Sequence, residues 1–285
     1  MLNRACYGQT PAVKFLIAMA AMVLINLNSA AQVVTHYYLD PENVDKISKF
    51  RSCAGHHYGY DQMFIDLGLY EVETDATESN RSMKHYFSPL EPFRTSGSNT
   101  TLELFAPFDG TIYRVTDEGH DSGYVNKQVW IQSSGSPDIF AILFHVNLSE
   151  VYPQYWNDYP AEYWPYHGDD DADFDRLAVA SGEAIGYADL RGTISDIAIL
   201  KKIDSSEYHY LSYFDETVMA ESVFDIYRQY DLTNRDYVIV SAEFRNANPL
   251  PEDCWDSFRE EDWFAFTATS IQPNIPIWLL YQISQ

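Results

Sequence analysis

Several imidazole and carboxylate groups of this chain have the spacing found in metal sites and in sites of acid–base catalysis. His57 and Asp61 are separated by three residues in the segment HYGYD, which is rich in turn-forming residues. Imidazole nitrogens and carboxylate oxygens both bind zinc. The pair is therefore a candidate for metal binding or for a general base, and the alternative is a hydrogen-bonded loop near Cys53.

A second candidate group surrounds His85, which Arg81, Lys84 and Tyr86 accompany in the chain. On a helix, residues three and four positions apart share a face, which would gather Arg81, Lys84 and His85 on one side. Their charges predict a binding clamp for an anion or a substrate carboxylate, with His85 as a catalytic or metal-binding imidazole. The alternative is that these cations pair with the abundant carboxylates of the chain.

His145 and Asp196 each lie in an apolar, strand-like segment, IFAILFHVNL and SDIAIL respectively. His145 is a candidate catalytic residue and Asp196 a candidate metal ligand, while the alternative for His145 is a structural histidine. Phe144 and Val146 are expected on the other face of the strand from His145. We expect no Ser195–His145–Asp196 triad, because no G-x-S-x-G motif is present and adjacent strand residues point to opposite faces.

The segments that would position these groups are short apolar runs separated by turns. Asp109-Gly110 and SSGSPD are turn sequences between such runs. Runs at this spacing are typical of an antiparallel meander and predict a mainly β fold. The predicted strands cover 102–108 and 111–115, on either side of the turn at Asp109-Gly110, and 127–132, 139–148, 177–187 and 193–200.

The flanking segments differ from this meander. Residues 32–52 predict an extended lead and a short polar helix, and the polar, turn-rich segment 32–100 as a whole is expected to pack on the core. Residues 206–285 predict an α+β extension. Within it, 216–230 has apolar residues at helical spacing, with Asp215 as a candidate N-cap, and 237–242 predicts a strand.

Three motifs resemble the lysostaphin/LytM-like zinc endopeptidases. They are APFDGTI at 106–112, ILFHVNL at 142–148 and AVASGEAIG at 178–186, in the order that this family shows. The resemblance covers about residues 80–205 and implies a small antiparallel β fold, a lysostaphin-like core at 101–205. It further implies a zinc-activated water that cuts peptide bonds in bacterial cell-wall cross-links. An insertion rich in tyrosine, tryptophan and aspartate, 151–175, interrupts the core and predicts a long loop.

The chain departs from the metal-ligand pattern of that family. His85 matches the histidine of its H-x-x-x-D motif, but Pro89 stands at the place of the aspartate. His145 matches an assisting histidine, whereas the strand that carries H-x-H in the family contains no histidine here, at 195–199. Two hypotheses follow. The chain is a non-catalytic protein that binds or regulates a cell-envelope polymer or peptide, or it is an active zinc hydrolase with a rearranged site. In the second case His57, Asp61, His85 and Asp196 are the candidate ligands.

The N-terminus predicts export. Arg4 and Lys14 precede an apolar run at 15–27, and small residues follow at 29–31. This is the pattern of a cleavable signal peptide, here 1–31. The run of 13 residues is shorter than the roughly 20 that a spanning helix needs. We therefore expect an extracytoplasmic protein, periplasmic or secreted, with no membrane span after cleavage.

Cysteine usage and charge agree with export. Cleavage would remove Cys6 and leave Cys53 and Cys254, a pair that predicts one disulfide in an oxidising compartment, with two buried thiols as the alternative. The formal net charge is −24. Such a surface repels phosphate backbones, which excludes nucleic acid and anionic membranes as partners.

Overall fold

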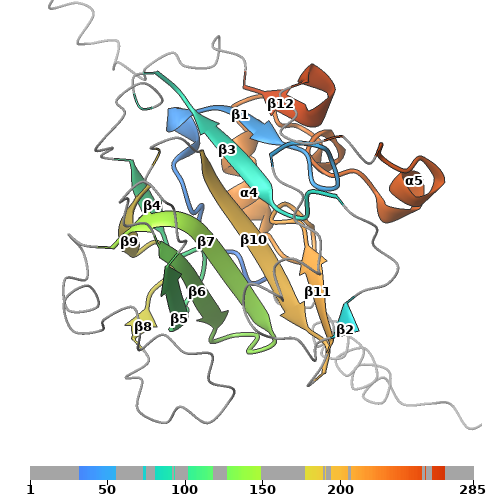
Figure 1. Ribbon diagram of the computed structural model, residues 1–285. Helices are drawn as coiled ribbons and strands as arrows, with labels where there is room; N and C mark the ends of the chain where they lie inside the picture. Colours follow the sequence, from blue (N-terminus) through green and yellow to red (C-terminus); the bar gives the residue numbers. More distant parts are fainter. Residues whose placement is uncertain are drawn as a thin grey trace, which may run out of the picture.

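One large, mainly antiparallel sheet organises the chain, as seen in a computed structural model (Figure 1). The predicted signal peptide, the pair His57 and Asp61, and the insertion 151–175 lie outside the described residues. The described residues are 32–55, 73–74, 81–91, 93, 102–117, 127–148, 177–188, 190, 194–204, 207–251, 254 and 259–266.

Among the described residues the sheet has 12 strands, and its main path runs in the order β12-β1-β3-β10-β7-β6-β5-β8. Away from this path, β11 pairs with β10 and β2, and β9 pairs with β4 and β7. The strands are β1 (Val44–Ser48), β2 (Glu73–Thr74), β3 (His85–Pro89), β4 (Glu103–Phe105), β5 (Gly110–Asp117), β6 (Lys127–Ser133), β7 (Ile139–Asn147), β8 (Ala178–Val179), β9 (Ala184–Ala188), β10 (Ser195–Lys202), β11 (Glu207–Leu211) and β12 (Trp263–Ala265).

The mainly β fold predicted from the sequence is confirmed, and β4 to β10 fall within or beside the predicted runs. The run predicted as one strand at 177–187 is two short strands, β8 and β9, because a turn at 180–183 separates them. Strands β1 and β3, from the N-terminal segment, pair with each other in the same sheet as the meander. The N-terminal segment is thus part of the sheet.

Both faces of the central strands are buried, which explains their nearly continuous apolar sequences. On one face, Leu143 and Ile197 join the larger core cluster, together with Phe224 of helix α4 (Glu221–Arg228). On the other face, Phe144 and Ala198 belong to a second cluster rich in aromatic residues. Figure 1 shows α4 behind the sheet, on the side opposite the viewer.

Helix α4 begins later than the sequence predicts. Residues 216–220 precede it, and Asp215 is not its cap but accepts a hydrogen bond from the amide of Thr217 in a turn. The amide of Val34 donates to the carbonyl of Val218, and Ala220 donates back to Val34. These long-range bonds hold Met219 in a bridge with Val34 after a turn at 215–218, so the regular helix begins only at Glu221.

Two other local predictions are wrong. The polar helix expected within 40–50 is a short 3-10 turn, η1 (Pro41–Asn43), after which β1 is held between β3 and β12. The strand expected at 237–242 contributes only an isolated bridge between Ile239 and Phe50. It is flanked by the 3-10 turn η3 (Arg235–Tyr237) and helix α5 (Ala242–Ala247).

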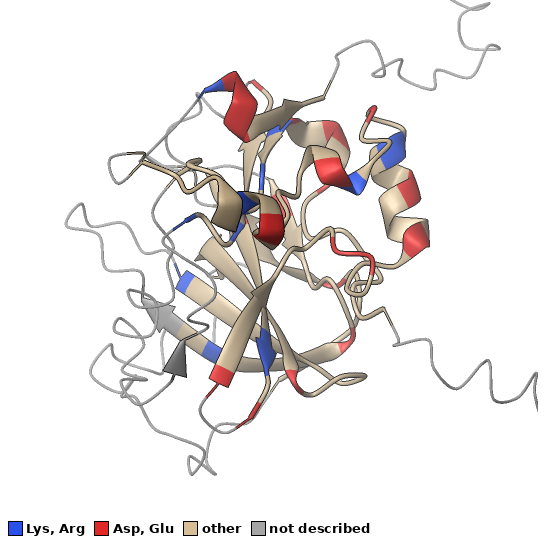
Figure 2. Cartoon of the chain, turned by 90° about the vertical axis from the view of Figure 1, so that its right-hand side faces the viewer, with Lys and Arg blue, Asp and Glu red and all other residues tan. Residues whose placement is uncertain are grey.

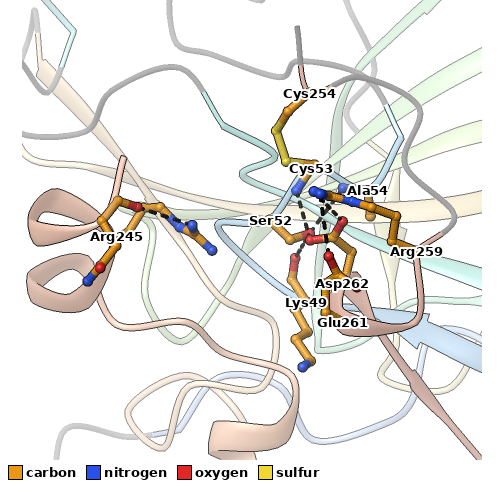
Figure 3. The surroundings of a disulfide bond; sticks show 10 residues. Lys49, Ser52, Cys53, Ala54, Arg245, Cys254, Arg259, Glu261 and Asp262 are labelled. Carbon is orange, nitrogen blue, oxygen red and sulfur yellow. Dashed lines mark hydrogen bonds and ion pairs between the residues drawn. A yellow bond between two sulfur atoms is a disulfide. The ribbon is translucent and has the colours of Figure 1, made fainter. Parts of the chain in front are cut away.

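The disulfide between Cys53 and Cys254 is confirmed, with a Cα–Cα distance of 5.4 Å and a sequence separation of 201 residues (Figure 3). The carboxylate of Asp262, itself buried, accepts a hydrogen bond from the amide of Cys53 at 3.3 Å. Arg259 donates to the other oxygen of Asp262 at 3.3 Å. The bridge therefore joins the residues after β1 to the segment that leads into the 3-10 turn η4 (Glu260–Asp262) and β12.

Acidic and basic residues are interspersed among the described residues seen in Figure 2. Figure 2 shows acidic positions on the helices and at strand ends, with fewer basic positions between them. Within the part of the chain that the structure describes, no helix is long and apolar enough to cross a membrane.

Candidate functional site

The sheet divides at the point where β7 changes partners, and Asp196 lies beside this point. Along its first part β7 pairs with β10, ending at the pair Leu143–Ile197. Further on, β7 pairs instead with β9, at Val146 and Asn147. Asp196 comes directly before Ile197, so its side chain lies where two strands part rather than within a continuous ladder.

A β-bulge in β7 lies at the same place. Across from β6, Leu143 pairs with Val129 and Val146 pairs with Lys127, which leaves Phe144 and His145 opposite a single residue. His145 has φ 56°, in the left-handed region that residues other than glycine seldom adopt. Bulges are enriched next to active sites, where they redirect a side chain.

The bulge corrects one expectation about the strand. The sequence pattern placed Phe144 and Val146 together on the face opposite His145. With the extra residue in β7, Val146 packs in the larger core while Phe144 and His145 both face the second cluster and Asp196. The local alternation of side chains could not indicate this, because a bulge shifts the pattern by one position.

Three ionisable side chains meet at this point: Lys84, Asp196 and His145. The ammonium of Lys84 forms an ion pair with Oδ2 of Asp196, and Nε2 of His145 lies 3.5 Å from Oδ1 of the same carboxylate. The Lys84 ammonium also lies 4.0 Å from the ring centroid of Phe144 and 4.8 Å from that of Tyr86. We call Lys84, Asp196 and His145 the buried charge cluster.

Burial gives the charged groups of this cluster a high desolvation free energy. The side chain of Asp196 is 0% exposed, that of Lys84 is 4% exposed, and that of His145 is 10% exposed. Removing a carboxylate and an ammonium from water costs several kcal/mol per ion, which only close pairing offsets. The cluster draws its members from three separate segments, so the tertiary fold brings the opposite charges together.

His85 does not join the buried charge cluster. Asp196 pairs directly with Tyr86 across β10 and β3, so these two residues share a face and His85 points to the other face. There Nδ1 of His85 donates to the carbonyl of Ser48 at 2.9 Å, and Nε2 accepts from the hydroxyl of Ser212 at 2.8 Å. Both ring nitrogens are thus occupied by the protein, and the structure does not bring His85 and Asp196 to one metal.

Burial also fixes the charge state of His85. Removal from solvent lowers the pKa of His85 from 6.5 to about 4, although the bond to Ser48 opposes the change. The ring packs against Phe50 and Phe214, with centroid distances of 5.7 Å and 5.0 Å. His85 is therefore a neutral, structural imidazole at physiological pH.

This state predicts acid sensitivity. The unfolded chain binds a proton at His85 near pH 6.5 and the folded chain only near pH 4, so stability is complete above pH 6.5 and falls as the pH drops towards 4. The difference corresponds to about 3 kcal/mol for this residue. In His85→Gln, urea unfolding at a series of pH values should show a correspondingly smaller loss between these limits. An unchanged pH dependence would contradict the assignment.

The other residues predicted to bind a ligand are also interior. Arg81 is 1% exposed, and its guanidinium donates to the amide oxygen of Asn246 at 2.8 Å. Tyr86 is 3% exposed and packs against Gly55, where a Cβ atom would come within 2.2 Å of its Cζ. Gly55 has φ 63°, so a side chain is disfavoured there on both grounds. These side chains therefore pack inside the fold, against Asn246 and Gly55.

The residues that the structure describes include no group of three or more histidine, cysteine or carboxylate side chains placed to hold a metal. Of the predicted zinc ligands, Asp196 has His145 as its nearest possible co-ligand, and Lys84 already contacts its second oxygen. His57 and Asp61 lie outside the described residues. Zinc therefore remains a prediction.

The sequence placed His145 and Asp196 in one hypothetical hydrolase site and Lys84 in a separate clamp with Arg81 and His85, but gave no reason to bring Lys84 to Asp196. The signal that could have linked them is the register of β3 and β10, which sets Asp196 beside Tyr86 and near Lys84. Register between strands far apart in sequence depends on the whole sheet. No local pattern in the sequence encodes it.

Two of the motifs behind the family resemblance lie side by side. Strand β8 pairs with β5 at Val179 and Gly110, and the carboxylate of Asp109 accepts a hydrogen bond from the amide of Ser181 at 2.8 Å. Comparison with protein-family models, curated proteins and solved structures finds no match to this chain. The resemblance to lysostaphin-like endopeptidases therefore stays a prediction.

Proposed function

We propose that the chain is an extracytoplasmic, non-catalytic protein that binds the peptide part of a cell-envelope polymer through a peptidase-like β domain. The proposal combines the motif resemblance with the chemistry of the buried charge cluster. The lysostaphin-like endopeptidases, which the motifs resemble, suggest the class of ligand. The cluster supplies the reason for expecting binding without cleavage.

The contact between Lys84 and Asp196 is the observation that carries this proposal. A zinc site that activates water needs about three protein donors and leaves one position open. Here the oxygen of Asp196 that could complete such a set faces an ammonium, which supplies the neutralising positive charge in place of a metal. A metal bound by Asp196 and His145 would have to displace this ammonium into an apolar, aromatic setting.

The disulfide supports the proposed location. Disulfides form and persist in oxidising compartments such as the periplasm and the extracellular space. The bond between Cys53 and Cys254 is consistent with the export signal predicted at 1–31.

Metal content and ligand binding test the proposal together. After incubation with excess zinc and desalting, the purified mature protein should not contain zinc in a stoichiometric amount. Elemental mass spectrometry measures the zinc content per chain. The protein should sediment with purified cell-wall polymer and release no peptide from it. The Asp196→Asn variant is compared with the wild type in both assays.

Two outcomes would sink the proposal. One is stoichiometric zinc in the wild type that Asp196→Asn loses, and the other is release of cell-wall peptides by the wild type. Asp138→Asn is the matched control, because Asp138 forms an exposed ion pair with Lys201 at 4.0 Å and should change neither assay. Failure to sediment with the polymer would refute the ligand class alone.

A further inference from the structure

The contact between Lys84 and Asp196 places an amine and a carboxyl group together in a site that excludes water. We propose that Lys84 and Asp196 condense into an amide cross-link between their side chains, with His145 transferring the proton. The inference goes beyond the proposed function and does not depend on it, because a cross-link would form whether or not the domain binds a polymer.

The first support is the geometry of the three groups. Nζ of Lys84 contacts Oδ2 of Asp196, which brings the nitrogen next to the carboxyl carbon. His145 approaches the other oxygen, Oδ1, from a distance of 3.5 Å. The nucleophile and the proton donor thus contact different oxygens of one carboxyl group. Reactants held in contact gain effective molarities on the order of 10⁵ M or more.

The second support is the burial of the pair. Asp196 is 0% exposed, and the rings of Phe144 and Tyr86 lie against the ammonium. In such a site two full charges are costly, whereas an amide is neutral and needs only hydrogen bonds. Water is the product that leaves, and a site without bulk water disfavours the reverse hydrolysis.

The reaction balances without any co-reactant. Proton transfer within the ion pair yields the neutral amine of Lys84 and the carboxylic acid of Asp196. The proton from the ammonium ends on Oδ1, and the nitrogen attacks the carboxyl carbon. Protonated His145 gives Oδ1 its second proton, the bond between that carbon and Oδ1 breaks to release one water molecule, and Oδ2 remains as the amide oxygen. The nitrogen returns a proton to His145. An ammonium and a carboxylate thus become an amide and water, with no oxidation or reduction.

The left-handed backbone at His145 has a role in this scheme. The bulge turns the imidazole towards Asp196, where the regular strand pattern would have turned it to the opposite face. Backbone strain of this kind costs about 1–3 kcal/mol and persists where the surrounding structure requires it. Here the strained backbone at His145 places its imidazole, the proposed proton-transfer group, next to Asp196.

Intact mass spectrometry of the reduced wild-type protein tests the inference. Its mass should be lower than that of its sequence by one water molecule, whereas Lys84→Arg should have its full sequence mass. Digestion with trypsin should yield a branched peptide in which the segment after Arg81 is joined to the segment 192–201, with no cleavage after Lys84. A His145→Gln variant should form the link more slowly, by about 100-fold or more.

Lys201→Arg is the matched control, since Lys201 is on the same strand as Asp196 but its ion pair with Asp138 is exposed. It should retain the mass deficit and the branched peptide. A folded wild-type protein with its full sequence mass overturns the inference, and that result is independent of how any variant folds. A mass deficit that persists in Lys84→Arg also overturns it.

Discussion

Replacing Cys53 and Cys254 together with alanine should lower the free energy of unfolding by about 3–5 kcal/mol. The bond spans 201 residues, and closing so long a loop removes much entropy from the unfolded chain. It also holds the residue whose amide donates to Asp262, next to β12 at the edge of the sheet. Urea unfolding with and without reductant measures the effect.

Each single replacement of Cys53 or Cys254 should destabilise the protein nearly as much as the pair, because either change opens the loop. Reductant should destabilise the wild type and leave the double variant unchanged. An equal urea midpoint for the oxidised wild type and the double variant would show that the bond does not constrain the unfolded state.

Whether Lys84 is ion-paired with Asp196 or joined to it by an amide, Lys84→Met should destabilise the protein by at least about 3–5 kcal/mol, because it leaves the carboxylate of Asp196 buried without a partner. Methionine has a similar length and packs well against aromatic rings, so lost volume contributes little. Chemical unfolding at neutral pH measures the change. The exposed pair of Lys201 and Asp138 provides the comparison, and Lys201→Met should cost less than about 1 kcal/mol.

A second replacement separates buried charge from packing. In Lys84→Met with Asp196→Leu, no charge remains to be paired in the apolar site, and much of the lost stability should return. Both variants lack the proposed cross-link, so the difference between them reports the unpaired carboxylate alone. Equal stabilities of the single and double variants would contradict a charge-based explanation.

The meander was predictable because its signals are local. Alternating and continuous apolar runs, bounded by turns such as Asp109-Gly110, identify β5, β6 and β7 within a few residues of their ends. Each run specifies a strand whatever it pairs with. The helical spacing before Tyr230 likewise identified α4, but its start depends on hydrogen bonds to Val34, far away in the chain.

For the candidate site, the sequence identified members but not their arrangement. His85 and Asp196 were both candidate ligands of one metal in the hydrolase hypothesis, yet the register of β3 and β10 puts them on opposite faces of the sheet. His145 was expected to point away from Phe144, and a single extra residue in β7 brings both to the same face. Register and bulges follow from how a whole sheet packs, so short-range patterns carry little information about them.

By itself, the sequence indicated that this chain is mainly β and favoured a disulfide between Cys53 and Cys254, because alternation, turns and a count of cysteines are properties of the chain alone. Only the tertiary structure decided that Lys84 meets Asp196 beside His145. Their positions are set by strand pairing between distant segments, and burial then makes each charge depend on the others.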